Sequence, residues 1–490
     1  MSVARRVAKN ILSLLLSEAI FQLLSLSVIL YIARILGPAS FGNLNYAMAV
    51  ISYFVLITNL GLPLLGIREV SRDRSRVKEY LVSITSTRLT VLLPSLILIA
   101  CIFQFLVFTI EANYLILIYG VGLIPNVFLI DWLFQGLEKM EYVAVGRILN
   151  IIVYCSLVFA LVHTPEDIMF IPAFQVMGIV TAVTVLLVIF IRIFGNVRLG
   201  WNAAAMKKML SSALPLGICQ IMIQVIYNID TIMLGFYVSS DAIGFYNAAY
   251  KIILAIVLAG SIYFDSIFPL ISQYYRTALN QMQHVQVFST RLVSIFVFPM
   301  TIGGVILAEP IILLLYGNEY AAGIDSLRIL LCMASFIFIN SIFGRGLWAS
   351  DRQRIFLRIV TAQAAVNILL NLAFIPWAGI EGAALSTLAA ELVGIYLYYS
   401  EFNKIVNIPL PAPFIKPAVA SAIMGGLLMA SREVMELHLS ILIIMGTVIY
   451  FTALYLLKGI TGEDARTIRA LLFGEQPSKG YSGEDSDRLS

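Results

Sequence analysis

Charged side chains lie inside several long apolar stretches of this sequence, where they could carry chemistry. Lys251 ends the segment IGFYNAAYK (residues 243–251), and the chain then continues IILAIVLAG. A charge within an apolar membrane segment is costly and is a functional candidate by default. Lys251 is therefore a candidate for binding an anionic group near mid-depth of a membrane. The alternatives are snorkelling to the outer headgroups or an ion pair with Glu391.

Four arginines extend this set of cations. Arg34 and Arg328 fall near the outer ends of apolar stretches, and Arg88 and Arg291 occupy the same place in two copies of the sequence STRL, at cytoplasmic edges. A planar guanidinium can bind phosphate through two parallel hydrogen bonds. All four are candidates for binding an anion. Snorkelling is the alternative for the first two, and cytoplasmic anchoring for the STRL pair.

Among the acids inside apolar stretches, three stand out, namely Glu18, Asp230 and Glu391. Carboxylates within a membrane can relay protons or coordinate Na⁺, so they mark ion pathways. These residues are candidates for binding a coupling ion. For Glu18 and Asp230, pairing between helices or contact with water is an equally compatible role.

The composition defines the class of protein to which these charges belong. Of 490 residues, 60% are hydrophobic and 12% are charged, whereas soluble domains average about 25% charged residues. Apolar stretches of about 20 residues recur along the chain, and each is long enough to cross a bilayer as a helix. The sequence therefore predicts an all-α polytopic membrane protein with fourteen spans, at residues 11–36, 41–65, 88–110, 114–136, 143–163, 168–194, 209–237, 241–268, 286–308, 324–347, 356–376, 379–400, 414–433 and 438–458.

The connections between the predicted spans alternate in charge. Basic residues gather after even-numbered spans, as between Arg68 and Lys78, whereas odd-numbered connections carry acids such as Glu111 or no charge. Positive charge is retained on the cytoplasmic side of a membrane. Both termini are therefore predicted to be cytoplasmic, in a multi-pass protein of the plasma membrane.

The first twelve predicted spans contain a repeat. Matching segments recur in order at a nearly constant offset: Gly42 and Asn45 against Gly244 and Asn247, STRL at 86–89 and 289–292, and QGL at 135–137 against RGL at 345–347. An even number of spans per copy gives a parallel repeat, an architecture that places a site between two bundles at mid-depth. The predicted domains are bundles at 1–200 and 201–405, two added helices at 406–460 and a disordered cytoplasmic tail at 461–490.

Motifs for catalysis or cofactor binding are not found. The four cysteines lack metal-type spacing, and the sequence contains neither a Gly-Lys dipeptide, which a P-loop needs, nor HExxH. We therefore expect no cofactor and no metal centre. Energy for any transport must come from an ion gradient, the membrane potential or removal of the product.

Two segments resemble a known family. RILGPASFGNLNYA (residues 34–47) and NIDTIMLGFYVSSDAIGFYNAAYKI (residues 228–252), together with fourteen spans in two halves, resemble the Wzx-like polysaccharide flippases of the multidrug/oligosaccharidyl-lipid/polysaccharide exporter superfamily. The resemblance implies alternating-access translocation of an oligosaccharide linked to polyprenyl phosphate or pyrophosphate, from the cytoplasmic to the outer leaflet. It implies membrane lipids as partners, no nucleic acid, and H⁺ or Na⁺ as a coupling ion. A monomer suffices, because two halves complete a cavity.

Two other functions remain open from the sequence. An ion-coupled multidrug or cation antiporter of the related branch would prefer an acid-lined cavity, and Glu18 and Asp230 are compatible with it. A membrane enzyme such as a glycan polymerase would need a sizeable loop or soluble domain to hold its catalytic groups, and no connection between spans is long enough to provide one.

Overall fold

The structure is a computed structural model that describes residues 3–105, 109–408, 410, 412–434 and 438–459. Within its helices, the side chains of residues 3–19, 102, 104–105, 412 and 433–434 are not described. The predicted tail at 461–490 lies outside the described residues. Every regular element in the described part of the chain is helical, as the apolar stretches predicted.

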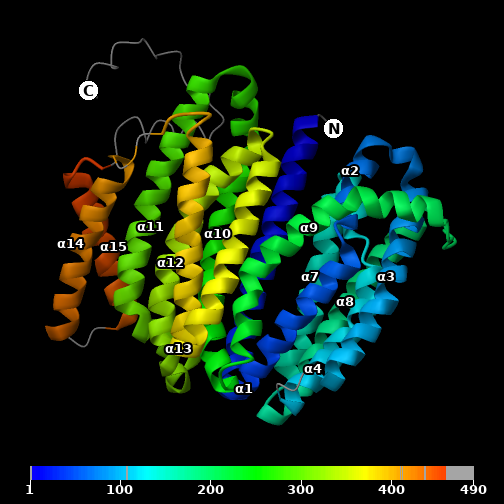
Figure 1. Cartoon of the computed structure of the whole chain (residues 1–490), viewed down its shortest axis with the longest axis horizontal. Helices are drawn as coiled ribbons and strands as arrows, with labels where there is room; N and C mark the ends of the chain where they lie inside the picture. Colours follow the sequence, from blue (N-terminus) through cyan, green and yellow to red (C-terminus); the bar gives the residue numbers. More distant parts are fainter. Residues whose placement is uncertain (1–2, 106–108, 409, 411, 435–437, 460–490) are drawn as a thin grey trace. The chain divides into compact units, whose positions relative to one another are not determined.

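In the described part of the chain, whose longer helices are labelled in Figure 1, fifteen α-helices and three short 3₁₀ helices follow one another. They are α1 (Val3–Asn59), α2 (Leu62–Arg72), η1 (Arg74–Arg76), α3 (Val77–Phe105), α4 (Ile110–Val121), α5 (Leu123–Val127), α6 (Asp131–Gly136), α7 (Met140–Leu161), η2 (Pro165–Met169), α8 (Phe170–Phe194), α9 (Ala203–Leu234), α10 (Ser240–Thr277), α11 (Leu279–Tyr316), η3 (Asn318–Gly323), α12 (Ile324–Ala349), α13 (Gln353–Phe402), α14 (Ala412–Val434) and α15 (Leu439–Leu456).

Twelve helices of the described chain are long and apolar enough to cross a membrane. Two of them greatly exceed the length of about 20 residues that one crossing needs, since α1 has 57 residues and α13 has 50. Each contains a glycine with positive φ, Gly37 at 71° and Gly379 at 56°. These glycines lie where the sequence predicts one span to end and the next to begin. The count of fourteen crossings stays a prediction.

The second of these long helices folds back on itself. Asn367 Nδ2 donates to Thr387 Oγ1 at 3.1 Å, although the two residues lie on opposite sides of Gly379. Glycine adopts positive φ without the steric cost of a Cβ, and so permits the sharp reversal. The two arms of α13 therefore face one another and present their side chains to a shared interior.

The predicted span at 114–136 is broken into α4, α5 and α6. Residues 128–130 lie outside any helix, between α5 and α6. Irregular backbone within a membrane is tolerated only where its polar groups find partners inside the protein. The partner in this case is Arg88 of α3, described below.

The chain forms two compact units. One comprises residues 1–269 and 308–402, and contains α1 to α9, most of α10, α12 and α13. The other comprises residues 270–307 and the described residues from 403 onward, including α14 and α15. These units are defined by contacts and not by the sequence repeat. The division into two six-helix bundles and two added helices stays a prediction.

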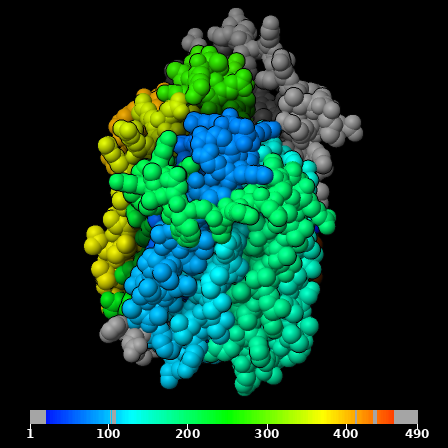
Figure 2. Space-filling model, turned by 90° about the vertical axis from the view of Figure 1, so that its right-hand side faces the viewer, coloured from blue at the N-terminus to red at the C-terminus, as the bar shows by residue number. Residues whose placement is uncertain are grey.

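Helix packing in the larger unit combines neighbours in sequence with helices from distant parts of the chain. In that unit α7 packs on α8 and α1, and α13 packs on α12 and α9 (Figure 1). Trp132 of α6 is fully buried in an apolar cluster with residues of α2 and α3. Figure 2 shows the stretch around residue 200 beside α2 and α3, where Ser86 Oγ donates to Gly200 O at 2.9 Å.

The repeated glycines bring α1 and α10 into backbone contact. A Cβ added to Gly42 would lie 1.9 Å from Ser240 O, and one added to Gly244 would lie 2.1 Å from Pro38 O. Both distances are far below van der Waals contact, and the opposing atoms belong to the backbone. The matching positions of the two sequence repeats thus touch each other, and glycine is required at both.

We expect Gly244→Ala to lower the melting temperature of the purified protein by several degrees, because overpacking costs about 1 to 3 kcal/mol. Gly426→Ala in α14 is the matched control, since a Cβ there meets nothing within 4 Å. Thermal unfolding followed by fluorescence measures both. Equal melting temperatures for the two variants would contradict the required close approach.

Candidate functional site

Lys251 lies in the first half of α10 and is partly buried. Its ammonium group forms no hydrogen bond or ion pair with any described residue. The ion pair with Glu391, an alternative that the sequence left open, does not form. The adjacent Tyr250 stacks on Tyr246, with ring centroids 5.8 Å apart. A lysine without a partner inside a membrane helix keeps its charge available for an external anion.

Arg34 and Arg328 both have partners within the protein. Arg34 Nε donates to Leu315 O at 2.9 Å, and its Nη2 donates to Leu314 O. These carbonyls belong to the last turn of α11, where helix carbonyls lack intrahelical donors and a cation is favourable. Arg328 forms an ion pair with Asp325 at 2.7 Å, one turn away on α12. Their structural contacts do not depend on a ligand.

Arg88 is buried, with 2% of its surface exposed. Its Nη2 donates to Asn126 O at 2.6 Å and its Nη1 donates to Leu129 O at 3.2 Å. Both carbonyls lie at the break between α5 and α6. Asn126 O also accepts from Leu129 N at 3.0 Å, so Leu129 O is the carbonyl that depends on the guanidinium for its hydrogen bond. Arg291, its partner in the STRL repeat, is partly buried in α11 in the other compact unit.

We expect Arg88→Met to destabilise the protein by about 2 to 3 kcal/mol, because it removes two hydrogen bonds from a buried charged group and leaves Leu129 O without a donor. Urea or thermal unfolding of the purified protein measures the effect. The matched control is Arg328→Met, which removes an exposed pair of a kind worth only about 0.3 to 0.5 kcal/mol. Similar unfolding of both variants would argue against a structural role for Arg88.

Asp230 of α9 lies at the centre of a buried polar cluster, and only 3% of its surface is exposed. Its carboxylate accepts hydrogen bonds from Tyr246 Oη at 2.7 Å, Asn371 Nδ2 at 2.6 Å and Thr387 Oγ1 at 2.5 Å. These donors come from α10 and from both arms of α13. Asp230 therefore does not face water, which was one of its predicted roles. It links helices to one another, which was the other.

The same cluster contains further oxygens. Asn371 Nδ2 also donates to Asn367 Oδ1 at 3.2 Å, and Ala383 O lies 3.1 Å from Thr387 Oγ1 as an alternative acceptor for the one hydroxyl hydrogen. The Oδ1 atom of Asn371 is buried without a hydrogen-bond donor. Carboxylate, amide, hydroxyl and carbonyl oxygens together form the kind of ligand set that binds a hard cation. The cluster can therefore hold Na⁺ or carry a proton on Asp230.

Glu391 belongs to a second polar group one helical turn further along α13. Its Oε2 accepts a hydrogen bond from Asn340 Nδ2 at 2.6 Å and a weaker one from Gln363 Nε2 at 3.4 Å. The third predicted acid, Glu18, is in α1, and its side chain lies outside the described residues. The structure therefore places Asp230 and Glu391 in one compact unit but on separate polar clusters.

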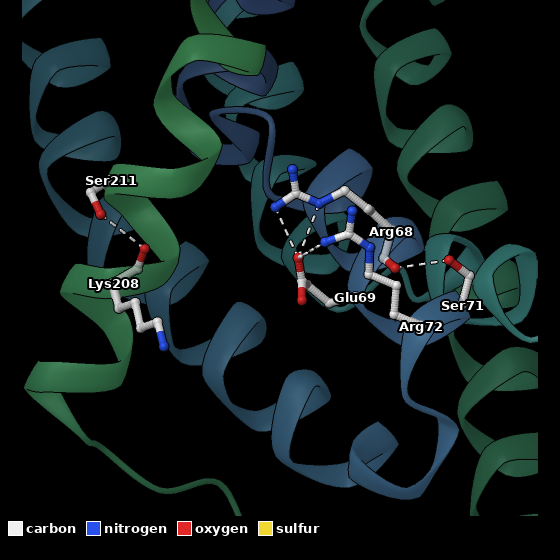
Figure 3. Close-up of polar contacts among 6 residues, drawn as sticks. All are labelled: Arg68, Glu69, Ser71, Arg72, Lys208 and Ser211. Carbon is white, nitrogen blue, oxygen red and sulfur yellow. Dashed lines mark hydrogen bonds and ion pairs between the residues drawn. The ribbon is translucent and has the colours of Figure 1, made fainter.

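A basic cluster lies at one end of α2 (Figure 3). Arg68 Nη2 lies 2.9 Å from Glu69 Oε1, and Arg72 Nη1 lies 4.0 Å from the same oxygen. Lys208 of α9 is drawn in the same view with Ser211, whose hydroxyl donates to its carbonyl at 3.0 Å. Two arginines that share one carboxylate leave net positive charge on this exposed surface. Sequence reasoning used these residues only to orient the chain.

Sequence reasoning also missed the amides that surround the acids. Gln363, Asn367 and Asn371 recur every four residues in an apolar stretch, which places them on one face of a helix. This amide stripe was a usable signal, because polar groups inside a membrane must find partners. The distant donors Tyr246 and Asn340 gave no comparable signal.

These features define a class of protein. A polytopic helical membrane protein with interior carboxylates and a cation inside an apolar helix is the arrangement of a secondary transporter, because such groups are retained where ions or substrates pass. The family model described as polysaccharide biosynthesis protein matches residues 7–275, and the one described as lipid II flippase MurJ matches residues 144–459. The chain belongs to the polysaccharide biosynthesis protein family, the Wzx-like branch of its exporter superfamily.

Relatives with curated descriptions carry related names. The chain is 24% identical over 391 residues to a putative O-antigen transporter of Shigella dysenteriae, covering 79% of this chain and 97% of the relative. It is 28% identical over 198 residues to probable flippase AglR of Haloferax volcanii, covering 40% of this chain and 41% of AglR. The second alignment thus spans less than half of AglR.

A solved structure shares the fold. Lipid II flippase MurJ in an inward-closed conformation aligns with a TM-score of 0.74 and 15% sequence identity, covering 89% of this chain and 97% of that chain. At this identity the likeness establishes the fold alone. Together with the family match and the apolar helices, it identifies the chain as a multi-pass protein of the plasma membrane.

Proposed function

We propose that this protein is a flippase that moves an oligosaccharide linked to polyprenyl phosphate or pyrophosphate from the cytoplasmic to the outer leaflet. The observation that carries the proposal is Lys251, a cation in the first half of α10 in a family of polysaccharide biosynthesis proteins, with no partner among the described residues. At about 1.5 Å per residue, its Cα lies roughly 16 Å along α10 from Ser240. An ammonium at that depth matches an anionic phosphate that must cross the apolar core.

The proposed substrate pathway starts at the basic cluster of Arg68, Arg72 and Lys208. Net positive charge on the cytoplasmic side attracts anionic headgroups, at about 1 kcal/mol per basic residue. The carrier phosphate would therefore concentrate at this surface before it meets Lys251. The reaction is translocation without covalent change, by a monomer, so that the product differs from the substrate only in its leaflet.

We place the coupling ion at the Asp230 cluster. The carboxylate, the orphaned Oδ1 of Asn371 and the hydroxyl of Thr387 offer oxygens from α9 and both arms of α13. An ion held there would draw these segments together, and its departure would leave a buried negative charge, which is costly. Occupancy by Na⁺ or H⁺ therefore biases the packing of α9, α10 and α13, which is what coupling to transport requires.

Native mass spectrometry of protein purified gently from its own cells tests the proposed function. A bound lipid that fragments into a polyprenyl phosphate and a sugar series is the expected result, and it would identify the carrier and the glycan together. Folded protein that carries only bulk phospholipid would count against the flippase. The Lys251→Met variant serves as the control, and we expect it to retain less of the lipid.

The alternative function, an ion-coupled cation antiporter, is favoured by one observation. Glu391 lines a cavity and has no Lys or Arg partner among the described residues. An antiporter would drive a cationic dye out of proteoliposomes when an ion gradient is imposed, and Glu391→Gln would stop it. Gradient-driven transport of a lipid-linked glycan without dye efflux would support the flippase.

A further inference from the structure

A cavity of about 530 Å³ lies in the larger compact unit, among α9, α10, α12 and α13. Its volume falls within the range of about 300 to 1,000 Å³ typical of sites for small organic molecules. Aromatic side chains form much of its wall, and polar groups converge on one part of it. The residues used below are Asn340, Gly344, Trp348, Phe356, Tyr398 and Glu391.

Two acceptor atoms of residues that line this cavity lack hydrogen-bond donors among the described residues. Glu391 Oε2 receives its hydrogen bonds from amides, whereas its Oε1 has no donor among the described residues. The Oδ1 atom of Asn340 is buried and has no hydrogen-bond partner. Both residues are 6% exposed. A buried acceptor without a donor costs about 1 to 3 kcal/mol, and more when charged, so these atoms point to a ligand that donates hydrogen bonds.

The charge of the site specifies a cationic donor. Arg345, the basic residue that lines the cavity, is already paired with Asp265, so these two charges cancel. Glu391 therefore leaves the lining with one uncompensated negative charge. A buried carboxyl group stays ionised only where it is paired or binds a cation, so ionised Glu391 takes its counter-ion from outside the protein.

The aromatic walls favour an organic cation over an inorganic one. Trp348 contacts Phe356 at 5.3 Å between ring centroids, and Phe356 contacts Tyr398 at 5.7 Å, so three rings form a continuous wall. Aromatic faces attract cations and also bury apolar surface. A bare metal ion would fill only a small part of a cavity of about 530 Å³. Trp348 is 44% exposed, so the cavity is accessible along this wall.

We propose that this cavity binds a protonated organic amine, with Glu391 as its counter-ion, Asn340 Oδ1 as a hydrogen-bond acceptor and the Trp348–Phe356–Tyr398 wall against its apolar part. The site is separate from Lys251, whose positive charge suits an anion, and from the Asp230 cluster, which is enclosed and rich in oxygen. The proposal concerns binding, and it stands whether or not the amine is transported.

The test uses phenethylammonium chloride as the probe. Its amine is protonated at pH 7, as alkylamines are, and its phenyl group can pack against the aromatic wall. Isothermal titration calorimetry of the full-length protein in detergent measures its affinity. We expect saturable binding that weakens about tenfold or more in Glu391→Gln, which removes the charge and keeps the shape. Glu381→Gln, at the start of the second arm of α13 and outside the cavity lining, is the control and should bind like the wild type.

Two further measurements separate the site from nonspecific partitioning and from misfolding. The neutral isostere 2-phenylethanol should give no saturable binding. Gly344→Val should abolish amine binding without altering Glu391, because a Cβ there already lies 3.3 Å from Phe356 and 3.5 Å from Tyr398 and a larger side chain fills the cavity. Equal affinity in Glu391→Gln, equal binding of 2-phenylethanol, or undiminished binding in folded Gly344→Val would overturn the proposal.

Discussion

Replacing Lys251 by methionine is expected to reduce glycan export at least about tenfold, because a charge-assisted hydrogen bond to phosphate contributes about 1.5 to 3 kcal/mol. Methionine keeps much of the length of the side chain and removes the charge. Lys251→Arg should retain most of the activity, since a guanidinium also binds phosphate. The measurement is surface glycan in cells that depend on this protein, normalised to the amount of protein in the membrane.

Lys251 differs from Arg34, Arg88 and Arg328 because it has no partner among the described residues. Arg34 and Arg88 already donate to backbone carbonyls, and Arg328 is paired with Asp325. Lys416→Met in α14 is the matched control, because its Nζ donates to Lys458 O at 2.9 Å and it should leave export unchanged. Wild-type export by Lys251→Met would remove Lys251 from the transport site and favour snorkelling.

Replacing Asp230 by asparagine is expected to uncouple transport from the ion gradient. The change removes the negative charge and places an amide N–H₂ among three donors, Tyr246, Asn371 and Thr387, so at least one hydrogen bond is lost. We expect gradient-driven flipping in proteoliposomes to fall to the level without a gradient, and stability to drop by about 1 to 3 kcal/mol. Flipping under an imposed Na⁺ or H⁺ gradient, with melting temperature measured in parallel, tests both effects.

Two further variants test the role of Asp230 in coupling. Asp241→Asn makes the same exchange at an exposed acid in the first turn of α10 and should transport normally. Thr387→Val removes one donor to Asp230 and leaves the charge in place, so it reports on coupling if Asp230→Asn does not fold. Gradient-dependent flipping at the wild-type rate in both Asp230→Asn and Thr387→Val would move the coupling site elsewhere, with Glu391 the next acid to test.

The fold class and the family followed from local sequence. Length and composition of the apolar stretches determine a polytopic helical protein, because a membrane forces every spanning segment to satisfy its own backbone. The repeated Gly42 and Gly244 were visible as a sequence echo, and the structure explains them as a contact between α1 and α10. Periodicity and repetition are properties of the chain itself, so they can be read without coordinates.

The roles of the charged residues were decided by tertiary structure. Arg34 meets Leu314, 280 positions away, and Asp230 meets Asn371, 141 positions away. Local periodicity contains no information about such partners. It also could not indicate that Arg88 serves the break between α5 and α6, since the sequence there predicts one continuous span.

The sequence by itself determined that this is a membrane protein of the polysaccharide exporter type, with Lys251, Asp230 and Glu391 inside its apolar segments. Only the tertiary structure decided that Asp230 is enclosed by donors, that Glu391 faces a cavity with unfilled acceptors, and that Lys251 has no partner among the described residues. The physical reason is that burying a charge has a cost set by its neighbours, and α9, α10, α12 and α13 bring those neighbours together only when they pack.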